Sequence, residues 1–192
     1  MNNTIFTLDQ NAAIKAGGGE YISETGYYFG QIDSAEYVTA GTGTFGLELS
    51  ISTDGGKANY LTMYYAKSDN TPINGGSNMI QAIMALTGCQ SLTMMQQNTP
   101  QGPVNIAPEL TGKQIGFVLQ KVLYTKGDGS EGHKFQIVTV ANQQNQTAKE
   151  MLEKKQPAKV ESILSTLKDK DERKTVNQNA PSGGYNPANN NF

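Results

Sequence analysis

The sequence predicts a mostly-β domain with one intervening helix, and three observations support this fold class. Segments rich in aromatic and β-branched residues are separated by turns that contain glycine. The chain of 192 residues holds 21 glycines and no tryptophan, a composition typical of turn-rich β proteins rather than helical bundles. Only one stretch within the β-rich region places its apolar residues at helical spacing. The length fits one domain with appended segments.

Residues 1–25 are expected to form a flexible N-terminal arm that precedes the domain. Within this arm, Asp9 is placed to cap a short helix that runs to Lys15. The glycines at 17–19 would end that helix and separate the arm from the domain.

Three strands are expected to begin the domain. The first, at 26–40, is long and stops at a glycine turn. The second is the clearest, because large apolar residues alternate with small or polar ones, which is the period of a half-buried strand. These apolar residues are Phe45, Leu47, Leu49 and Ile51. The Asp54-Gly55-Gly56 turn then leads into a third strand at 57–67. Alternation puts Leu61, Met63 and Tyr65 on one face of this strand and Tyr60, Thr62 and Tyr64 on the other.

The second half of the domain contains the helix and two more strands. The helix is expected at Ser77–Thr87, with Gly88 at the position that ends it. Residues 89–111 are rich in Gln, Asn and Pro, and we expect a long loop without regular structure there. Two strands follow at 111–126 and 132–142, so the order of elements is β-β-β-α-β-β.

This order is found in the OB-fold, a five-stranded and partly open barrel whose second and third strands bind oligonucleotides or oligosaccharides. The sequence therefore predicts an OB-fold-like five-stranded barrel over residues 26–142. Other small barrels and sandwiches share the same order of elements.

A helical segment and a tail are expected after the barrel. The helical segment spans 147–170, and its apolar residues form a stripe that should dock on another surface. The stripe consists of Val160, Ile163, Leu164 and Leu167. Residues 175–192 hold too few apolar side chains to offset the entropy of ordering, so we expect a disordered tail.

Several kinds of chemistry are excluded by composition. Cys89 is the single cysteine and His133 the single histidine, so one chain offers neither a disulfide nor a thiolate zinc cluster nor a His-based triad. No glycine-rich motif that cradles phosphates is present. The sequence therefore predicts a protein that is not an enzyme and binds no metal or cofactor.

The chain is also expected to remain in the cytoplasm. Its N-terminal residues have neither the basic nor the apolar region of a secretory signal, and no apolar run is long enough to span a membrane. The net charge of −2 argues against the strongly basic surface of a duplex-DNA-binding protein.

Single-stranded nucleic acid is bound by aromatic rings that stack on bases and by cations that follow the phosphates. The candidate rings are Tyr27, Phe29 and Tyr37, expected on one face of the first strand, and Tyr60 and Tyr64 on the third. Candidate phosphate contacts are Lys57 and Lys67, which bracket the third strand, and Lys121, Lys126 and Lys134 in the last hairpin. The region is net acidic, so these lysines would have to form a local stripe. The rings are equally suited to the core or to cross-strand pairs, and the lysines to ordinary solvation.

Several segments together resemble a known family. The segments are GYYFGQI, GTGTFGLELSI, GGSNMIQAIMALTG, ELTGKQIGFVLQKVLY and TAKE. In this succession, from Gly26 to Glu150, the chain resembles the OB-fold single-stranded DNA-binding proteins that phages encode beside their recombination genes.

The resemblance implies sequence-independent binding and protection of single-stranded DNA during phage replication or recombination, in the host bacterial cytoplasm. It also implies self-association into a homo-oligomer. Proteins of this class often end in a flexible tail whose terminal aromatic residue docks on replication or recombination enzymes, and Phe192 looks similar. That tail is usually acidic, whereas this one is neutral.

Two other functions remain open at this point. A phage structural or assembly protein would use exposed aromatic residues and the helix at 158–168 for subunit contacts, without DNA binding. A carbohydrate-binding or hydrolytic barrel would stack sugars on the same tyrosines and would need a pair of carboxylates.

Overall fold

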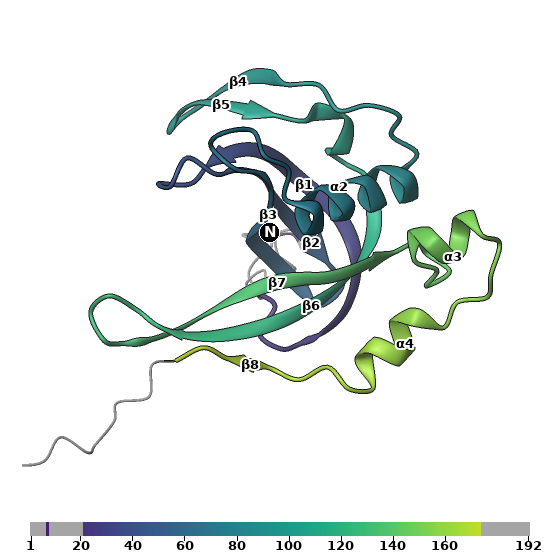
Figure 1. Cartoon of the computed structure of the whole chain (residues 1–192). Helices are drawn as coiled ribbons and strands as arrows, with labels where there is room; N and C mark the ends of the chain where they lie inside the picture. Colours follow the sequence, from purple (N-terminus) through teal and green to yellow (C-terminus); the bar gives the residue numbers. More distant parts are fainter. Residues whose placement is uncertain (1–6, 8–20, 174–192) are drawn as a thin grey trace, which may run out of the picture.

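A computed structural model describes Thr7 and residues 21–173 of the chain. The predicted helix from Asp9 to Lys15 and the predicted tail at 175–192, with Phe192, lie outside the described residues. Within them the fold is mostly β with one main helix, as the sequence predicts (Figure 1). None of the described helices is long and apolar enough to cross a membrane.

The described elements comprise eight strands and four short helical segments. The strands are β1 (Gly26–Thr39), β2 (Phe45–Thr53), β3 (Gly56–Ala66), β4 (Met95–Thr99), β5 (Gly102–Ile106), β6 (Gln114–Thr125), β7 (Glu131–Ala141) and β8 (Lys170–Asp171). The helical segments are α2 (Asn74–Thr87), the 3-10 turn η1 (Pro108–Leu110), α3 (Ala148–Leu152) and α4 (Lys159–Leu164).

The strands form one sheet that is antiparallel except at its last strand. Its order is β3-β2-β1-β5-β4, and β6 pairs both with the first half of β1 and with β7. The short β8 runs parallel to β6, where Val122 and Leu123 pair with Lys170 and Asp171. No ladder joins β3 to β7 among the described residues, so the sheet is not closed into a barrel.

The main core lies on the inner face of this curved sheet, where apolar residues alternate with polar ones. On β2, Leu47, Leu49 and Ile51 are fully buried, which confirms the alternation seen in the sequence. Helix α2 covers one end of the core with Ile83. The helix ends at Gly88, whose φ of 71° is the left-handed conformation that glycine adopts without strain.

The prediction of an irregular loop at 89–111 is wrong, because this segment contains the β4–β5 hairpin and η1. A two-residue turn between Thr99 and Gly102 closes the hairpin, and β5 joins the sheet through the pairing of Ile106 with Glu36 on β1. Four of the five β4 side chains are exposed. A strand exposed on both faces has no alternating apolar residues, so its sequence carries no period-2 signal.

The last residues of the predicted N-terminal arm contact the sheet. The amide of Ile22 donates a 2.9 Å hydrogen bond to the carbonyl of Lys57, and the Ile22 side chain is 2% exposed in the main core. Tyr21 forms a parallel bridge with Lys57 on β3. The ordered domain therefore begins before Gly26, at the open edge of β3.

The apolar stripe that follows β7 docks on the outer side of the sheet. Ile163, Leu164 and Leu167 pack with Val160 against a second core cluster formed by Val118 on β6 and Ala141 on β7. The segment at 147–170 thus folds back onto its own chain rather than extending away from it (Figure 1).

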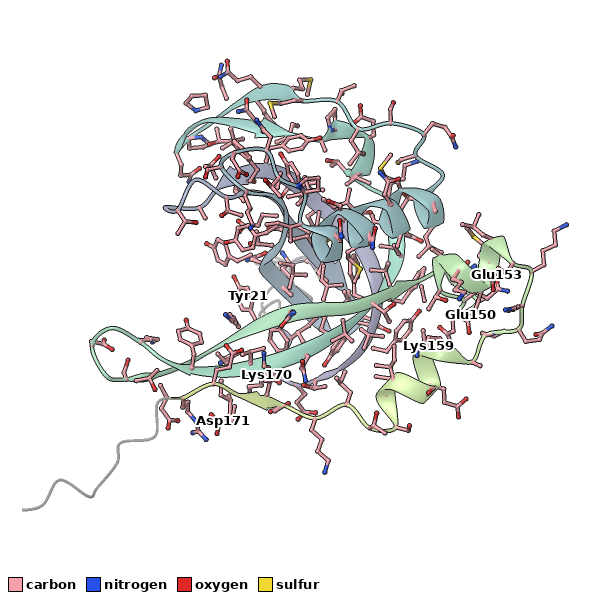
Figure 2. All side chains as sticks on the ribbon, viewed as in Figure 1. Tyr21, Glu150, Glu153, Lys159, Lys170 and Asp171 are labelled. Carbon is pink, nitrogen blue, oxygen red and sulfur yellow. The ribbon has the colours of Figure 1, made fainter. Side chains whose placement is uncertain are left out.

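Glu150 holds α3 and α4 together (Figure 2). Its carboxylate accepts hydrogen bonds from the amide and hydroxyl of Thr147 and from the amides of Ala158 and Lys159. The Thr147 amide is the strongest of the influences that lower the pKa of this carboxyl, from 4.5 to about 2, against an opposing effect of burial. Thr147 and Glu150 form a reciprocal capping box, which explains why the helix starts here.

We expect Glu150→Gln to lower the free energy of unfolding at pH 7 by about 2 to 3 kcal/mol, because a neutral amide cannot accept all four hydrogen bonds. The folded-state pKa lies below the unfolded one, so this contribution is complete above pH 4.5 and is lost as the pH falls to about 2. Denaturant unfolding between pH 7 and pH 2 should therefore show the wild type and the variant converging.

Glu153→Gln is the matched control, because this exposed side chain pairs only with Lys149 and Lys155 at the surface. It should unfold like the wild type at neutral pH. An unchanged stability of Glu150→Gln at pH 7 would contradict the role given to Glu150.

Candidate nucleic-acid interface

The outer face of β3 carries two of the predicted rings. Leu61 and Met63 point into the core, at 1% and 6% exposure, while Tyr60 and Tyr64 are 78% and 42% exposed on the opposite face. The two faces predicted for this strand are therefore confirmed at these four positions. Large aromatic side chains exposed on one face of a strand are what base stacking requires.

Tyr60 occupies an unusual backbone conformation. Its φ is 62°, in the left-handed region, where bulky residues are rare and strained. The strain arises at a β-bulge: Leu61 pairs with Leu49 and Ala58 pairs with Ile51, which leaves two β3 residues opposite Ser50. The bulge turns the Tyr60 ring outward into solvent.

The Tyr64 ring lies against the sheet beside it. It is opposite Gly46 on β2, and a Cβ atom built on Gly46 would be 3.2 Å from the ring carbon Cδ1 of Tyr64. This distance is tighter than an ordinary contact, so a side chain at position 46 would require the ring to shift by a few tenths of an ångström. The glycine leaves the ring in place beside β2, with 42% of the side chain exposed.

Tyr21 extends this aromatic surface and was not among the predicted site residues. It is 65% exposed, and its bridge to Lys57 aligns it with the outer face of β3. The sequence offered one signal, an aromatic residue two positions after the glycine run at 17–19. We define the β3 aromatic face as Tyr21, Lys57, Tyr60, Thr62 and Tyr64.

The predicted lysines fall into two groups. Lys57 and Lys67 are exposed at the two ends of β3 and bracket its tyrosines, as predicted. Lys121, Lys126 and Lys134 lie instead on the β6–β7 hairpin, which projects beyond the rest of the sheet in Figure 1.

Lys134 on this hairpin already has partners within the chain. Its ammonium is 3.9 Å from the Glu172 carboxylate and 5.9 Å from the centre of the Tyr124 ring. Arg173 binds Glu131 at the same end of the hairpin, at 2.8 Å. The residues around β8 thus neutralise part of the hairpin's charge.

Carboxylates lie close to the tyrosines on the neighbouring strands. Glu48 on β2 accepts a 2.7 Å hydrogen bond from the Thr62 hydroxyl, between Tyr60 and Tyr64 on the same face. Asp33 accepts a hydrogen bond from Ser52. The face is therefore mixed in charge, and rings rather than cations would provide most of the attraction for a single strand.

The three rings of β1 do not share one face, contrary to the prediction. The register of β1 shifts by one residue at Asp33, which reverses the side of the sheet on which later side chains lie. Tyr37 packs on the main core, and its hydroxyl donates to the Thr93 carbonyl at 3.3 Å. Tyr27 packs on the second cluster beside α4, and burial raises its pKa. Phe29 is half-buried opposite Gly116.

The described residues hold no group of three or more His, Cys, Asp or Glu side chains placed to bind a metal ion. The Cys89 thiol donates to the carbonyl of Glu109 and accepts from the Thr87 hydroxyl. Its contacts are those of a small structural residue that links the end of α2 to η1.

Comparison with models of known protein families finds no match to this chain, and comparison with curated proteins finds none either.

Proposed function

We propose that this protein binds single-stranded DNA without sequence preference and that the β3 aromatic face is its binding surface. The observation that carries the proposal is the pair of exposed rings at Tyr60 and Tyr64 on one rigid strand. Stacking contributes about 1 to 3 kcal/mol per base and tolerates any base, so two or three rings suffice for a weakly charged site.

The arrangement of five strands supports an OB-like barrel that is open on one side. β1 pairs with both β2 and β6, and β6 pairs with β7, which is the neighbour relation of an OB-fold. Between β3 and β7 lies a cavity of about 220 Å³, lined by Thr62 and Tyr64 from one strand and Gln136 and Ile137 from the other. In OB-folds the second and third strands form the ligand-binding face, and these correspond to β2 and β3 here.

The backbone strain at Tyr60 also supports a binding role. A bulky residue in the left-handed region costs about 1 to 2 kcal/mol relative to glycine. Such strain persists most often at functional sites, where it fixes the direction of a side chain. Here it fixes an exposed ring in the position where a base would stack.

The same resemblance that suggests this function suggests its setting. We place the protein in phage replication or recombination in a bacterial cytoplasm, where it would protect single strands as a homo-oligomer. Phe192 would then dock on partner enzymes of the same process.

The assembly-protein alternative loses one of the surfaces on which it relied. The apolar side of the helix at 158–168 packs against Val118 and Ala141 of its own chain, so it is not available to a neighbour. The sugar-binding alternative still has the exposed tyrosines on which sugars would stack. The nearby carboxylate of Glu48, however, already accepts a hydrogen bond from the Thr62 hydroxyl.

The proposal is tested by fluorescence anisotropy of a labelled oligo-dT and of a matched duplex, titrated with the full chain at low and moderate salt. We expect tighter binding to oligo-dT, with a slope of log affinity against log salt of about −1.4 if Lys57 and Lys67 each contact one phosphate. Equal binding of duplex and single strand, or no binding at micromolar protein in low salt, would overturn the proposal. A labelled oligosaccharide in the same assay tests the sugar-binding alternative.

A further inference from the structure

The exposed edge strand β4 carries no charge, and we propose that it pairs with β4 of a second copy of the chain across a two-fold axis. This inference names an interface for the proposed homo-oligomer and does not depend on DNA binding. It rests on three features: the charge distribution, the exposure of β4 and the direction of its backbone groups.

The first feature is a long uncharged stretch. No charged residue occurs between Asp69 and Glu109, although 17% of the whole chain is Asp, Glu, Lys or Arg. This stretch builds α2 and the β4–β5 hairpin, and the hairpin lies at the top of the molecule in Figure 1. Protein interfaces are depleted of charged residues and enriched in methionine, whereas a phosphate-binding surface needs cations. The uncharged β4 edge therefore fits a protein partner and not a nucleic acid.

The second feature is the exposure of β4 at the end of the sheet. Met94 and Met95 are 61% and 47% exposed, and Gln96, Gln97 and Asn98 are exposed as well. Proteins usually protect edge strands with lysine, proline or a covering segment. β4 has no charge and no proline, and no described strand pairs with its outer side.

The third feature is the direction of the backbone groups on β4. In an antiparallel ladder, alternate residues point both N–H and C=O toward the partner strand. Thr99 pairs with Gly102 at the turn, and Asn98 pairs with Pro103, which has no N–H to donate. The backbone N–H and C=O groups of Met95, Gln97 and Thr99 therefore face β5. The backbone groups of Gln96 and Asn98 face away from β5, toward solvent.

A second copy satisfies these outward groups without any change to the chain. With the two β4 strands antiparallel about Gln97, Gln96 of each chain lies opposite Asn98 of the other, and each such pair exchanges two hydrogen bonds. An isologous contact places the same strand of each copy against the other, with Gln96 opposite Asn98. Neither residue is charged, so a second copy presents a strand that satisfies the outward groups without burying a charge.

The test is charge swapping at the edge of the full chain, read by sedimentation velocity. Gln96→Lys with Asn98→Lys places lysines opposite lysines across the axis, and Gln96→Glu with Asn98→Glu does the same with carboxylates. Each variant should dissociate at least about tenfold more readily than the wild type, because like charges directly opposite are destabilising on a sheet. An equimolar mixture of the two variants should recover the dimer.

Lysines at the exposed positions Gln143 and Gln144, far from β4 in the sequence, are the matched control and should leave the association unchanged. A wild type that stays monomeric at about 100 µM, well above the micromolar affinities of weak specific complexes, would overturn the inference. So would Lys variants that associate as the wild type does, or a mixture that fails to recover the dimer. Oligo-dT binding by the variant with Gln96→Glu and Asn98→Glu tests the proposed function separately, because these substitutions lie outside the β3 aromatic face.

Discussion

Replacing both Tyr60 and Tyr64 with alanine should weaken binding to oligo-dT by about 30-fold or more, since each stacked ring contributes about 1 to 3 kcal/mol. Each single alanine variant should bind oligo-dT about fivefold more weakly than the wild type, or weaker still. The fold should survive, because both rings lie on the outer face of β3 and neither fills the core. Anisotropy titrations and thermal melts of the same samples measure the two effects.

Tyr60→Gly separates binding from stability most sharply. Glycine adopts a φ of 62° without strain, so this variant should melt at or above the temperature of the wild type while still losing oligo-dT affinity. Leu152→Ala is the control for removing an exposed apolar side chain, because Leu152 is 69% exposed on α3. A double tyrosine variant that binds oligo-dT like the wild type would exclude the β3 aromatic face as the site.

The neighbouring glycines at the start of α2 should respond in opposite ways to the same substitution. A Cβ atom on Gly76 would lie 1.9 Å from the Tyr64 carbonyl oxygen, which belongs to the backbone of β3 and cannot move aside alone. We expect Gly76→Ala to lower the free energy of unfolding by about 2 to 4 kcal/mol, because the helix must separate from the strand.

Gly75 provides the matched control one residue earlier. A Cβ atom there meets nothing within 4 Å, so Gly75→Ala should be neutral or stabilise the helix by up to about 1 kcal/mol. Denaturant unfolding of the two variants measures the difference. Equal stabilities of the two variants would mean that the start of α2 does not pack closely on the β3 backbone at Tyr64. The position given to Tyr64 would then be wrong.

The sequence predicts well the elements that have one buried face. The alternation of β2 and the outward direction of Tyr64 follow from period 2, because a buried face selects apolar residues at every second position. Tyr60 also points outward as predicted, but through a bulge that the period does not reveal. The helix that Gly88 ends was expected close to its observed position for a similar reason. The stripe of Val160 and Leu164 was expected to dock, and it does so on the outer side of the sheet.

The parts that were mispredicted lack such a signal. β4 is exposed on both faces, so its residues show no period, and its pairing depends on backbone hydrogen bonds that every sequence can make. The bulge at Asp33 inserts one residue into β1, and a single insertion reverses the face of Tyr37 without any local mark in the sequence. Tyr21 reaches the β3 aromatic face only through a bridge between distant segments.

The most direct test of the central claim is photo-crosslinking of the full chain to an oligo-dT in which 5-iodouracil replaces some thymines, followed by trypsin and mass spectrometry. Cleavage after Lys57 and Lys67 releases one peptide that contains Tyr60, Tyr64 and the half-buried Tyr65. If the β3 aromatic face binds the single strand, fragment spectra will place the adducts on Tyr60 or Tyr64. Adducts confined to other peptides, such as those of the β6–β7 hairpin, would contradict it.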